Sequence, residues 1–324
     1  MLGLRIAGTG SFLPGPPVPN SVLEAESGGA FEAAWVEQWT GIRTRHRAGP
    51  RDSVASLAAE ASSRALDAAG IAASDLRRIL LTTSTGGDRP GPATALDLQA
   101  RLGTSCLAMD IANGCHGFMT ALDLGARLVA TGEAPVLIVA SELLTRHRLD
   151  PGDRRVFPLF GDGAAAVVLD APRAEGGLLS SVHASRGEHL RALFCPGLDD
   201  PEVVDGATIR FLASGREMKR YVEELLPGLV LQAMAEAGVG PADIDWLVPH
   251  QPNAAWIVQL AALLGVPVER VPIVVDRSAN LPTAMVPLGL DQLWRSGRVR
   301  PGQLILSFGL GAGISFGATV LRVD

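Results

Sequence analysis

The chain of 324 residues has little charge and no long uninterrupted apolar stretch. Only 19% of its residues are charged and 47% are apolar, so a sizeable core can form and disorder is not expected. No run approaches the roughly 18 apolar residues of a membrane helix, and no membrane span is predicted. The first residues, MLGLRIAGTGSFLPG, lack the features of a secretory signal peptide.

Cysteine is also scarce. Cys106, Cys115 and Cys195 are too few and too irregularly spaced for a disulfide framework or a structural zinc site. We interpret them as free thiols in a reducing cytoplasm. The net charge of −6 gives nucleic-acid binding no electrostatic support. An acidic carrier protein would need a local basic patch, which the net charge neither shows nor excludes.

Apolar runs of strand length alternate with segments of helical periodicity. Helices are predicted for Val54–Ala69, Gly117–Ala130, Glu217–Ala237, Ala254–Leu264 and Pro282–Arg295. Strands are predicted for Ile79–Thr85, Leu107–Ala112, Pro135–Ala140, Trp246–Val248, Val271–Val275, Leu304–Ser307 and Ser315–Leu321. Apolar strands between helices indicate an α/β protein whose sheet is covered on both faces.

The chain resembles itself at one constant offset. The matching pairs are Ala69–Leu81 with Ala237–Pro249, Val136–Ile138 with Leu304–Leu306, and, more loosely, Asp110–Cys115 with Asp276–Pro282. Three matches at one offset predict two similar halves, 1–172 and 173–324, joined near residues 170–176.

Cys115 is a candidate nucleophile. It lies in the turn Asn113–Phe118 (NGCHGF), between a predicted strand and a predicted helix. A helix N-terminus favours negative charge, so the sulfur is expected to favour the thiolate. Taken alone, a cysteine in an apolar chain is more often a small buried hydrophobe, and that alternative stays open.

His250 and Asn280 each follow a predicted strand of the second half. The internal repeat places both at positions that should face the seam between the halves, together with Cys115. A lone histidine is otherwise usually structural, and an asparagine before Leu-Pro is typical of a helix cap. Because three such residues point to one seam, we predict that they act together.

The segment Ser307–Gly313 (SFGLGAG) is a glycine-rich turn between two predicted strands. It is either a tight hairpin or a source of backbone N–H groups, from Gly311, Ala312 and Gly313, that stabilise an oxyanion with the N–H of Cys115. It is not a dinucleotide-binding fingerprint, because a strand follows it and not a helix.

Together these motifs resemble the β-ketoacyl-acyl carrier protein synthase III family of the thiolase superfamily, over essentially the full length. The matching stretches are Gly8–Pro14 (GTGSFLP), Thr40–His46 (TGIRTRH), the Cys115 turn, Leu159–Ala165 (LFGDGAA), Pro249–Asn253 (PHQPN), Asn280 and the C-terminal glycine turn. The resemblance implies an α/β thiolase fold, with two similar halves in a layered α-β-α-β-α arrangement, and a homodimer.

The resemblance also implies a mechanism. Cys115 would take an acyl group from acyl-CoA, and a malonyl thioester on acyl carrier protein would then lose CO2. His250 and Asn280 would donate hydrogen bonds to the malonyl thioester carbonyl, where negative charge develops. The resulting carbanion would attack the acyl group on Cys115. No metal ion and no redox cofactor are implied.

The sequence departs from the family where CoA binds. Trp35, Arg154 and Asn253 match the CoA-binding positions of the family, whereas Trp39 and Ala255 occupy positions at which the family has arginine. Each replacement removes a charge-assisted contact to phosphate or adenine. The sequence therefore predicts weaker or altered binding of CoA.

Two further departures concern the carrier protein and the primer pocket. The predicted helix Ala254–Leu264 has no basic residue to dock an acidic carrier, which leaves Lys219 and Arg220 as candidates. Gly91 stands where the family often has an aromatic residue that closes the partner subunit's pocket, so a longer or bulkier acyl chain should fit. No role beyond packing is assigned to His116.

Other functions fit less well. A degradative thiolase needs a second cysteine in the C-terminal turn, and residues 307–317 have none. A Cys-His-Asn hydrolase fits the repeat poorly, and a silent subunit would not retain all three candidate residues. The alternative left open is a related acyltransferase of specialised metabolism, acting on a hydroxyl, amine or β-keto acceptor. The retained His250–Asn280 pair favours decarboxylative condensation.

Overall fold

The computed structural model describes residues 1–324 except 90, 147, 195–208 and 212–214. Two five-stranded sheets form the centre of this part of the chain. The first has the order β2 (Arg5–Phe12), β8 (Asp162–Asp170), β7 (Val136–Leu143), β5 (Arg78–Thr82) and β6 (Leu107–Ile111). The second has the order β1 (Leu2–Gly3), β9 (Gly177–Ser185), β14 (Ser315–Arg322), β13 (Leu304–Gly311) and β12 (Trp246–Leu247).

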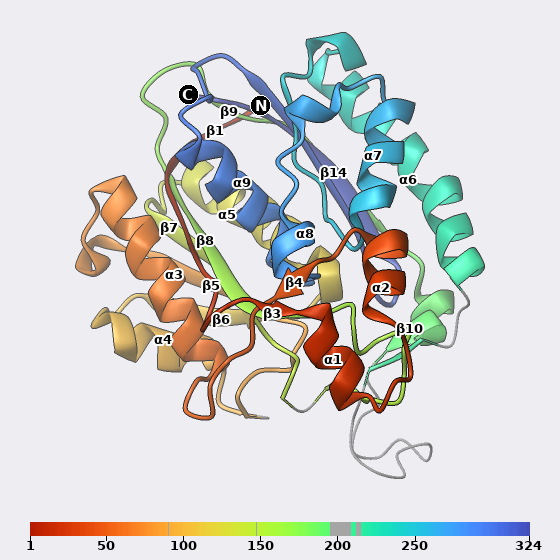
Figure 1. The fold of residues 1–324 in the computed structure, drawn as a ribbon. Helices are drawn as coiled ribbons and strands as arrows, with labels where there is room; N and C mark the ends of the chain where they lie inside the picture. Colours follow the sequence, from red (N-terminus) through yellow and green to blue (C-terminus); the bar gives the residue numbers. More distant parts are fainter. Residues whose placement is uncertain (90, 147, 195–208, 212–214) are drawn as a thin grey trace.

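Helices form three layers around the two sheets (Figure 1). The outer layers are α3 (Val54–Ala69) with α4 (Thr94–Leu102), and α6 (Gly215–Ala237) with α7 (Ala254–Leu263). Between the sheets lie α5 (Gly117–Ala130) and α9 (Met285–Arg295). The predicted α-β-α-β-α layering is confirmed.

Shorter elements complete the described fold. They are α1 (Asn20–Glu26), α2 (Ala33–Thr40), α8 (Val275–Ser278), β3 (Val18–Pro19), β4 (Thr44–Arg45), β10 (Leu193–Phe194) and β11 (Arg210–Phe211). A 3₁₀ turn at Gly114–His116 precedes α5.

The glycines of the first motif explain how α3 packs on β2. A Cβ atom on Gly8 would lie 2.3 Å from the carbonyl oxygen of Ala65, and one on Gly10 would lie 2.4 Å from the carbonyl oxygen of Ala61. Both distances are far below van der Waals contact, so only glycine permits this helix to touch the strand.

The internal repeat corresponds to the sheet topology. β5 and β12 occupy equivalent places beside the parallel strands β7 and β13, and β8 and β14 pair antiparallel with these in turn. The short strand β1, from the start of the chain, joins the second sheet. The domain boundary at 172/173 stays a prediction.

One predicted strand is wrong. Residues 271–275 form no strand, and α8 begins at Val275. Pro272 has no N–H to donate to a ladder. The buried Gln251 side chain instead donates to Pro272 O (2.8 Å) and accepts from the backbone N–H groups of Val274 (2.9 Å) and Val275 (3.3 Å). A side chain thus replaces the strand partner.

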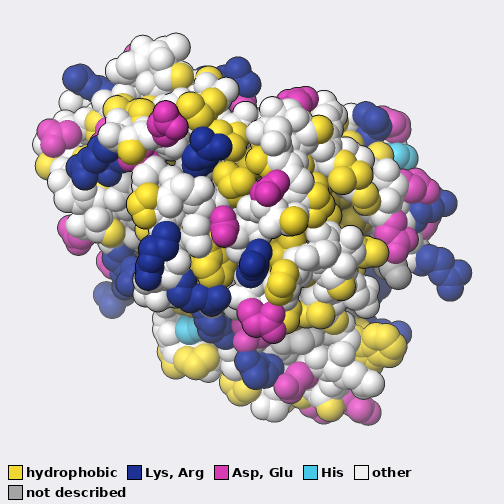
Figure 2. Space-filling view, turned by 90° about the horizontal axis from the view of Figure 1, so that it is seen from above, with side chains coloured by type: hydrophobic (Ala, Val, Ile, Leu, Met, Phe, Trp, Pro, Cys, Tyr) yellow, Lys and Arg dark blue, Asp and Glu magenta, His cyan; other side chains and the backbone are white. Residues whose placement is uncertain are grey.

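The face of the molecule drawn in Figure 2 mixes charges of both signs. Figure 2 shows acidic, basic and apolar side chains interspersed over one face, with no large field of a single sign. Within the described residues, no helix combines the length and hydrophobicity needed to cross a membrane.

Candidate active site

The three predicted catalytic residues line one cavity of about 450 Å³. Cys115 comes from the 3₁₀ turn before α5, His250 from the segment after β12, and Asn280 from the segment after α8. The cavity therefore lies at the seam between the two sheets, where the repeat predicted it.

The turn of Cys115 packs directly against the C-terminal hairpin. Gly114 has a φ of 49°, and a Cβ atom there would lie 3.3 Å from Ala312 N. A Cβ atom on Gly311 would lie 3.1 Å from Cys115 N. The backbone N–H groups of Ala312 and of Cys115 itself both face the sulfur and favour its anionic form. Of the three predicted hairpin residues, Ala312 is the one whose N–H faces the nucleophile.

The predicted thiolate is wrong for the resting protein. Burial, and then the negative charge of Glu142, raise the pKa of the Cys115 thiol to about 12, although the two backbone donors act in the opposite direction. Desolvation outweighs the helix terminus because an anion loses more solvation here than the fixed dipoles return. The nucleophile therefore rests as a thiol.

His250 is held by the second sheet. Its backbone N–H donates to Phe308 O of β13 at 2.8 Å, and the residue is 7% exposed. Burial lowers the pKa of the imidazole to about 4, so the ring is neutral at neutral pH. Its Nδ1 has no hydrogen-bond partner among the described residues. A neutral ring has one donor and one acceptor nitrogen to offer a substrate.

Asn280 is held by the segment that precedes β8. It forms an isolated parallel bridge with Phe160: Asn280 N donates to Leu159 O (2.9 Å) and Gly161 N donates to Asn280 O (3.2 Å). The preceding residue, Ala279, has φ 55° and ψ −173°, a region in which alanine is strained. The hydrogen bonds to Leu159 and Gly161 hold the backbone in this conformation. The side-chain Oδ1 of Asn280 has no hydrogen-bond partner in the described structure.

Glu142 is a buried residue that the sequence analysis missed. Its carboxylate accepts from Ser84 Oγ (2.9 Å), Thr85 Oγ1 (3.1 Å), Thr283 N (2.8 Å) and Thr283 Oγ1 (2.7 Å). Burial raises the pKa of this carboxyl group. The network ties the segment after β5 to the segment after Asn280. The available signal was a charged residue inside the apolar run of β7.

His116, which follows the nucleophile, does more than pack. The ring is 1% exposed, and its Nε2 lies 2.9 Å from Nδ1 of His183 on β9. Burial lowers the pKa of His116 to about 3. No local sequence pattern indicates this pair, because its members come from different halves.

The predicted CoA-binding residues also line the cavity, with Trp39 beside them. The Arg154 guanidinium carbon lies 5.8 Å from the centre of the Trp35 ring. Asn253 caps α7: its Oδ1 accepts from Trp256 N (3.1 Å), and its Nδ2 donates to Trp39 O (2.9 Å). The side chain of Asn253 is thus engaged within the protein.

Other predicted residues lie away from the cavity lining. Gly91 is on an exposed loop, with no atom within 4 Å of a Cβ built there, and Ala255 is exposed on α7. Arg220 is exposed and pairs with Glu224 at 3.8 Å. The side chain of Lys219 and the whole of Cys195 fall outside the described residues, whereas Cys106 and Cys115 are free.

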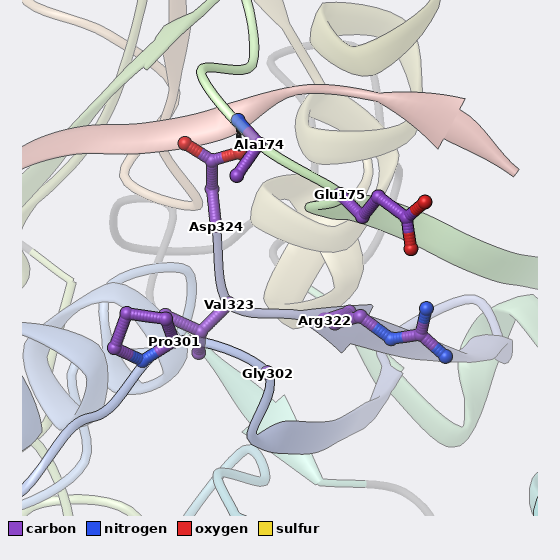
Figure 3. Close-up of a pocket in the computed structure, with 7 residues that line it drawn as sticks. All are labelled: Ala174, Glu175, Pro301, Gly302, Arg322, Val323 and Asp324. Atoms are coloured by element: carbon purple, nitrogen blue, oxygen red, sulfur yellow. Dashed lines mark hydrogen bonds between the residues drawn. The ribbon is translucent and has the colours of Figure 1, made fainter.

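A second cavity, of about 520 Å³, lies at the ends of β9 and β14 (Figure 3). Asp324 closes one side of it by accepting from Ala174 N at 2.7 Å. Its lining has no histidine or cysteine. No group of three or more potential metal ligands occurs in the described part of the chain.

Comparison with known proteins agrees with this geometry. A family model described as 3-oxoacyl-[acyl-carrier-protein (ACP)] synthase III matches residues 109–187, and the model of its C-terminal part matches residues 234–323. The β-ketoacyl-[acyl-carrier-protein] synthase III of Erythrobacter litoralis is 39% identical over 99% of this chain and 100% of its own length.

Solved structures give the same result. The synthase III of Thermus thermophilus is 32% identical, with a TM-score of 0.91 over 99% of both chains. A priming β-ketosynthase from the R1128 polyketide biosynthetic pathway is 31% identical, with a TM-score of 0.89 over 99% of this chain and 97% of that one. The protein is thus a condensing acyltransferase of the thiolase fold. Within that class, the chain belongs to the β-ketoacyl-[acyl-carrier-protein] synthase III family.

Proposed function

We propose that the protein condenses an acyl group from acyl-CoA with a malonyl group on acyl carrier protein, through an acyl-Cys115 intermediate, to give a β-ketoacyl product and CO2. The observation that carries the proposal is that Cys115, His250 and Asn280 line one cavity, with the backbone N–H groups of Cys115 and Ala312 facing the sulfur.

In the first half reaction, Cys115 sulfur attacks the acyl-CoA carbonyl and CoA leaves with the thiol proton. The two backbone donors hold the oxyanion of the tetrahedral intermediate. Because the resting thiol has a raised pKa, the proton must leave the sulfur as the bond forms. The neutral imidazole of His250 lines the same cavity and can accept it.

In the second half reaction, the malonyl carboxylate leaves as CO2, and its electron pair passes to the methylene carbon. His250 and Asn280 donate to the thioester oxygen, on which this charge accumulates. Uncharged donors suit the step, because they stabilise the enolate more than the neutral starting carbonyl. The enolate then attacks the acyl carbon on Cys115.

We extend the proposal to partners and location. Trp35 and Arg154 would hold CoA, with Asn253 supporting the same wall. The acyl carrier protein would dock near Lys219 and Arg220. A homodimer would form along β6, one of the two edge strands of its sheet, where Leu107 is 56% exposed. Gly91 would then border the partner's primer pocket. We propose a cytoplasmic enzyme that uses no cofactor beyond its substrates.

The first test follows both products. Enzyme loaded with acyl-CoA is mixed with malonyl-acyl carrier protein, and CO2 and product mass are measured. We expect CO2 and a β-ketoacyl product from the wild type and from Cys106→Ser, since Cys106 lies outside the cavity. Cys115→Ser should form no acyl-enzyme. A wild type that carries acyl-Cys115 and releases no CO2 would contradict the proposal.

A second candidate is acyl transfer in specialised metabolism. Trp39 on the cavity wall and the similarity to a polyketide priming ketosynthase favour it. Product analysis with hydroxyl, amine and β-keto acceptors separates the two. Transfer that proceeds without malonyl thioester, and faster than condensation, would make this second function the correct one.

A further inference from the structure

A chain of hydrogen-bonding side chains leads away from the nucleophile's turn. His116 Nε2 lies 2.9 Å from His183 Nδ1, and His183 Nε2 lies 2.8 Å from Ser181 Oγ. Ser181 also hydrogen-bonds Asp123 of α5, which pairs with Arg127 at 2.9 Å. His183 is exposed on β9, so the chain joins a buried ring to the surface of the protomer.

The neighbouring strand makes room for the two rings. A Cβ atom on Gly317 of β14 would lie 2.4 Å from His183 Nδ1 and 2.7 Å from His116 Cε1. Any side chain at this position would therefore displace one ring. The rings cross at 65° with their centres 5.1 Å apart, which leaves the two nitrogens facing each other.

The inner end of the chain reaches the cavity wall. His116 Nδ1 is buried, and a hydrogen bond of the ring to the backbone of Gly309 favours its protonated form. A Cβ atom on Gly309, which lines the cavity, would lie 3.6 Å from this nitrogen and 3.5 Å from His250 Cβ. The two histidines thus flank the same glycine.

The proposed reaction requires a proton at this place. In condensation the carboxylate–methylene bond breaks, a bond to the acyl carbon forms, and the bond between that carbon and Cys115 sulfur breaks. The electron pair of the last bond stays on sulfur, so each turnover consumes one proton to restore the thiol. A substrate that fills the cavity blocks direct access of water to this sulfur.

We propose that His116 and His183 form a relay that carries this proton from solvent to the active-site cavity. The inference rests on the proposed condensation. His183 takes a proton from solvent on Nε2 and passes one from Nδ1 to His116 Nε2, and His116 releases one from Nδ1 towards the cavity. His250 faces the inner end of the relay, at His116, and Asp123 and Arg127 face its outer end, at His183.

The ionisation of the two rings suits a relay. Burial lowers the pKa of both rings below the ordinary value, and the His183 ring adds to this for His116, as Arg127 does for His183. Each ring is therefore neutral at neutral pH, with one nitrogen protonated and the other free. A neutral imidazole can accept a proton on one nitrogen while it donates from the other.

The test separates the two half reactions. Acylation consumes no proton, so His183→Gln should acylate Cys115 within about twofold of the wild type. In a single turnover of pre-acylated enzyme with malonyl thioester, this variant should condense about tenfold more slowly or worse, as expected for loss of a positioned proton donor. His116→Gln should behave likewise. His189→Gln serves as the matched control, because His189 is not part of this row of hydrogen-bonded side chains.

Chemical rescue distinguishes a relay from a structural role. Added imidazole should restore condensation to His183→Ala, since the site of the missing ring is open to solvent, and should leave acylation unchanged. Wild-type condensation rates in both His183→Gln and His116→Gln would overturn the relay. Absence of CO2 from the wild type would overturn the proposed function itself, and that result is seen before any variant is made.

Discussion

Gly311 and His116 touch so closely that a methyl group on the glycine would stand 2.7 Å from the backbone nitrogen of the histidine. The C-terminal hairpin is therefore pressed against the turn that carries the nucleophile. The contact aligns Ala312 N–H with Cys115 sulfur, although the two segments lie in different halves of the chain.

Gly311→Ala should reduce acylation of Cys115 about 100-fold, because the hairpin must move and one oxyanion donor is lost. Gly187→Ala is the matched control for stability, since a methyl group there would meet no atom within 4 Å. Acyl-enzyme formation by mass spectrometry and urea unfolding check both variants. Equal acylation rates for Gly311→Ala and wild type would refute the alignment.

Glu142 should control the reactivity of Cys115. Its charge is one cause of the raised pKa of the thiol, so Glu142→Gln should lower that pKa. At pH 8 the rate of alkylation by iodoacetamide should rise at least about threefold, because more thiolate is present. Glu133→Gln, at a surface pair with Arg78, should change nothing. A rate that stays constant would mean that burial alone sets the pKa.

His250 should make the protein sensitive to acid. Its pKa is about 4 in the folded protein and near 6.5 when unfolded. Above pH 6.5 both states are neutral and stability is unaffected. Between pH 6.5 and 4 only the unfolded state binds the proton, so the free energy of unfolding falls by about 1.4 kcal/mol per pH unit, or about 3 kcal/mol in all.

His250→Gln removes this titration. Urea unfolding between pH 7 and 4 should therefore show a smaller loss of stability for the variant than for the wild type. Identical slopes would show that His250 is protonated in the folded protein, contrary to its burial.

Trp39 offers a test of the altered CoA surface. Trp39→Arg places a cation on the cavity wall that we propose binds CoA, and it should lower the KM for acyl-CoA about tenfold at low salt. This decrease in KM should become smaller as the salt concentration rises. Trp39→Gln controls for loss of the ring. If the arginine and glutamine variants have the same KM, this wall does not bind phosphate.

Most of the layered fold could be predicted because apolar strands and amphipathic helices have local signatures. The predicted helices Val54–Ala69 and Gly117–Ala130 match α3 and α5 residue for residue. The repeat added the relation between the halves, which placed the candidate residues at one seam. The strand expected at Val271–Val275 failed because a distant side chain, Gln251, supplies its hydrogen bonds.

The ionisation of the site could not be predicted in the same way. The helix terminus behind Cys115 is visible in the sequence, but the desolvation that outweighs it depends on how the two halves close over the sulfur. The contact of His116 with His183 has the same cause. Packing between the two halves determines both the raised pKa of Cys115 and the contact between His116 and His183. No local sequence pattern predicts this packing.

The strained backbone at Ala279 lowers the stability of the fold but restricts the orientation of Asn280. A left-handed φ with extended ψ suits glycine, and holding alanine there costs about 1–3 kcal/mol. Ala279→Gly would release that energy and yield a more heat-resistant protein. It would also let the next residue, Asn280, sample more orientations. Substitutions meant to raise the thermal stability of this enzyme should therefore be made away from Ala279, where they leave the orientation of Asn280 unchanged.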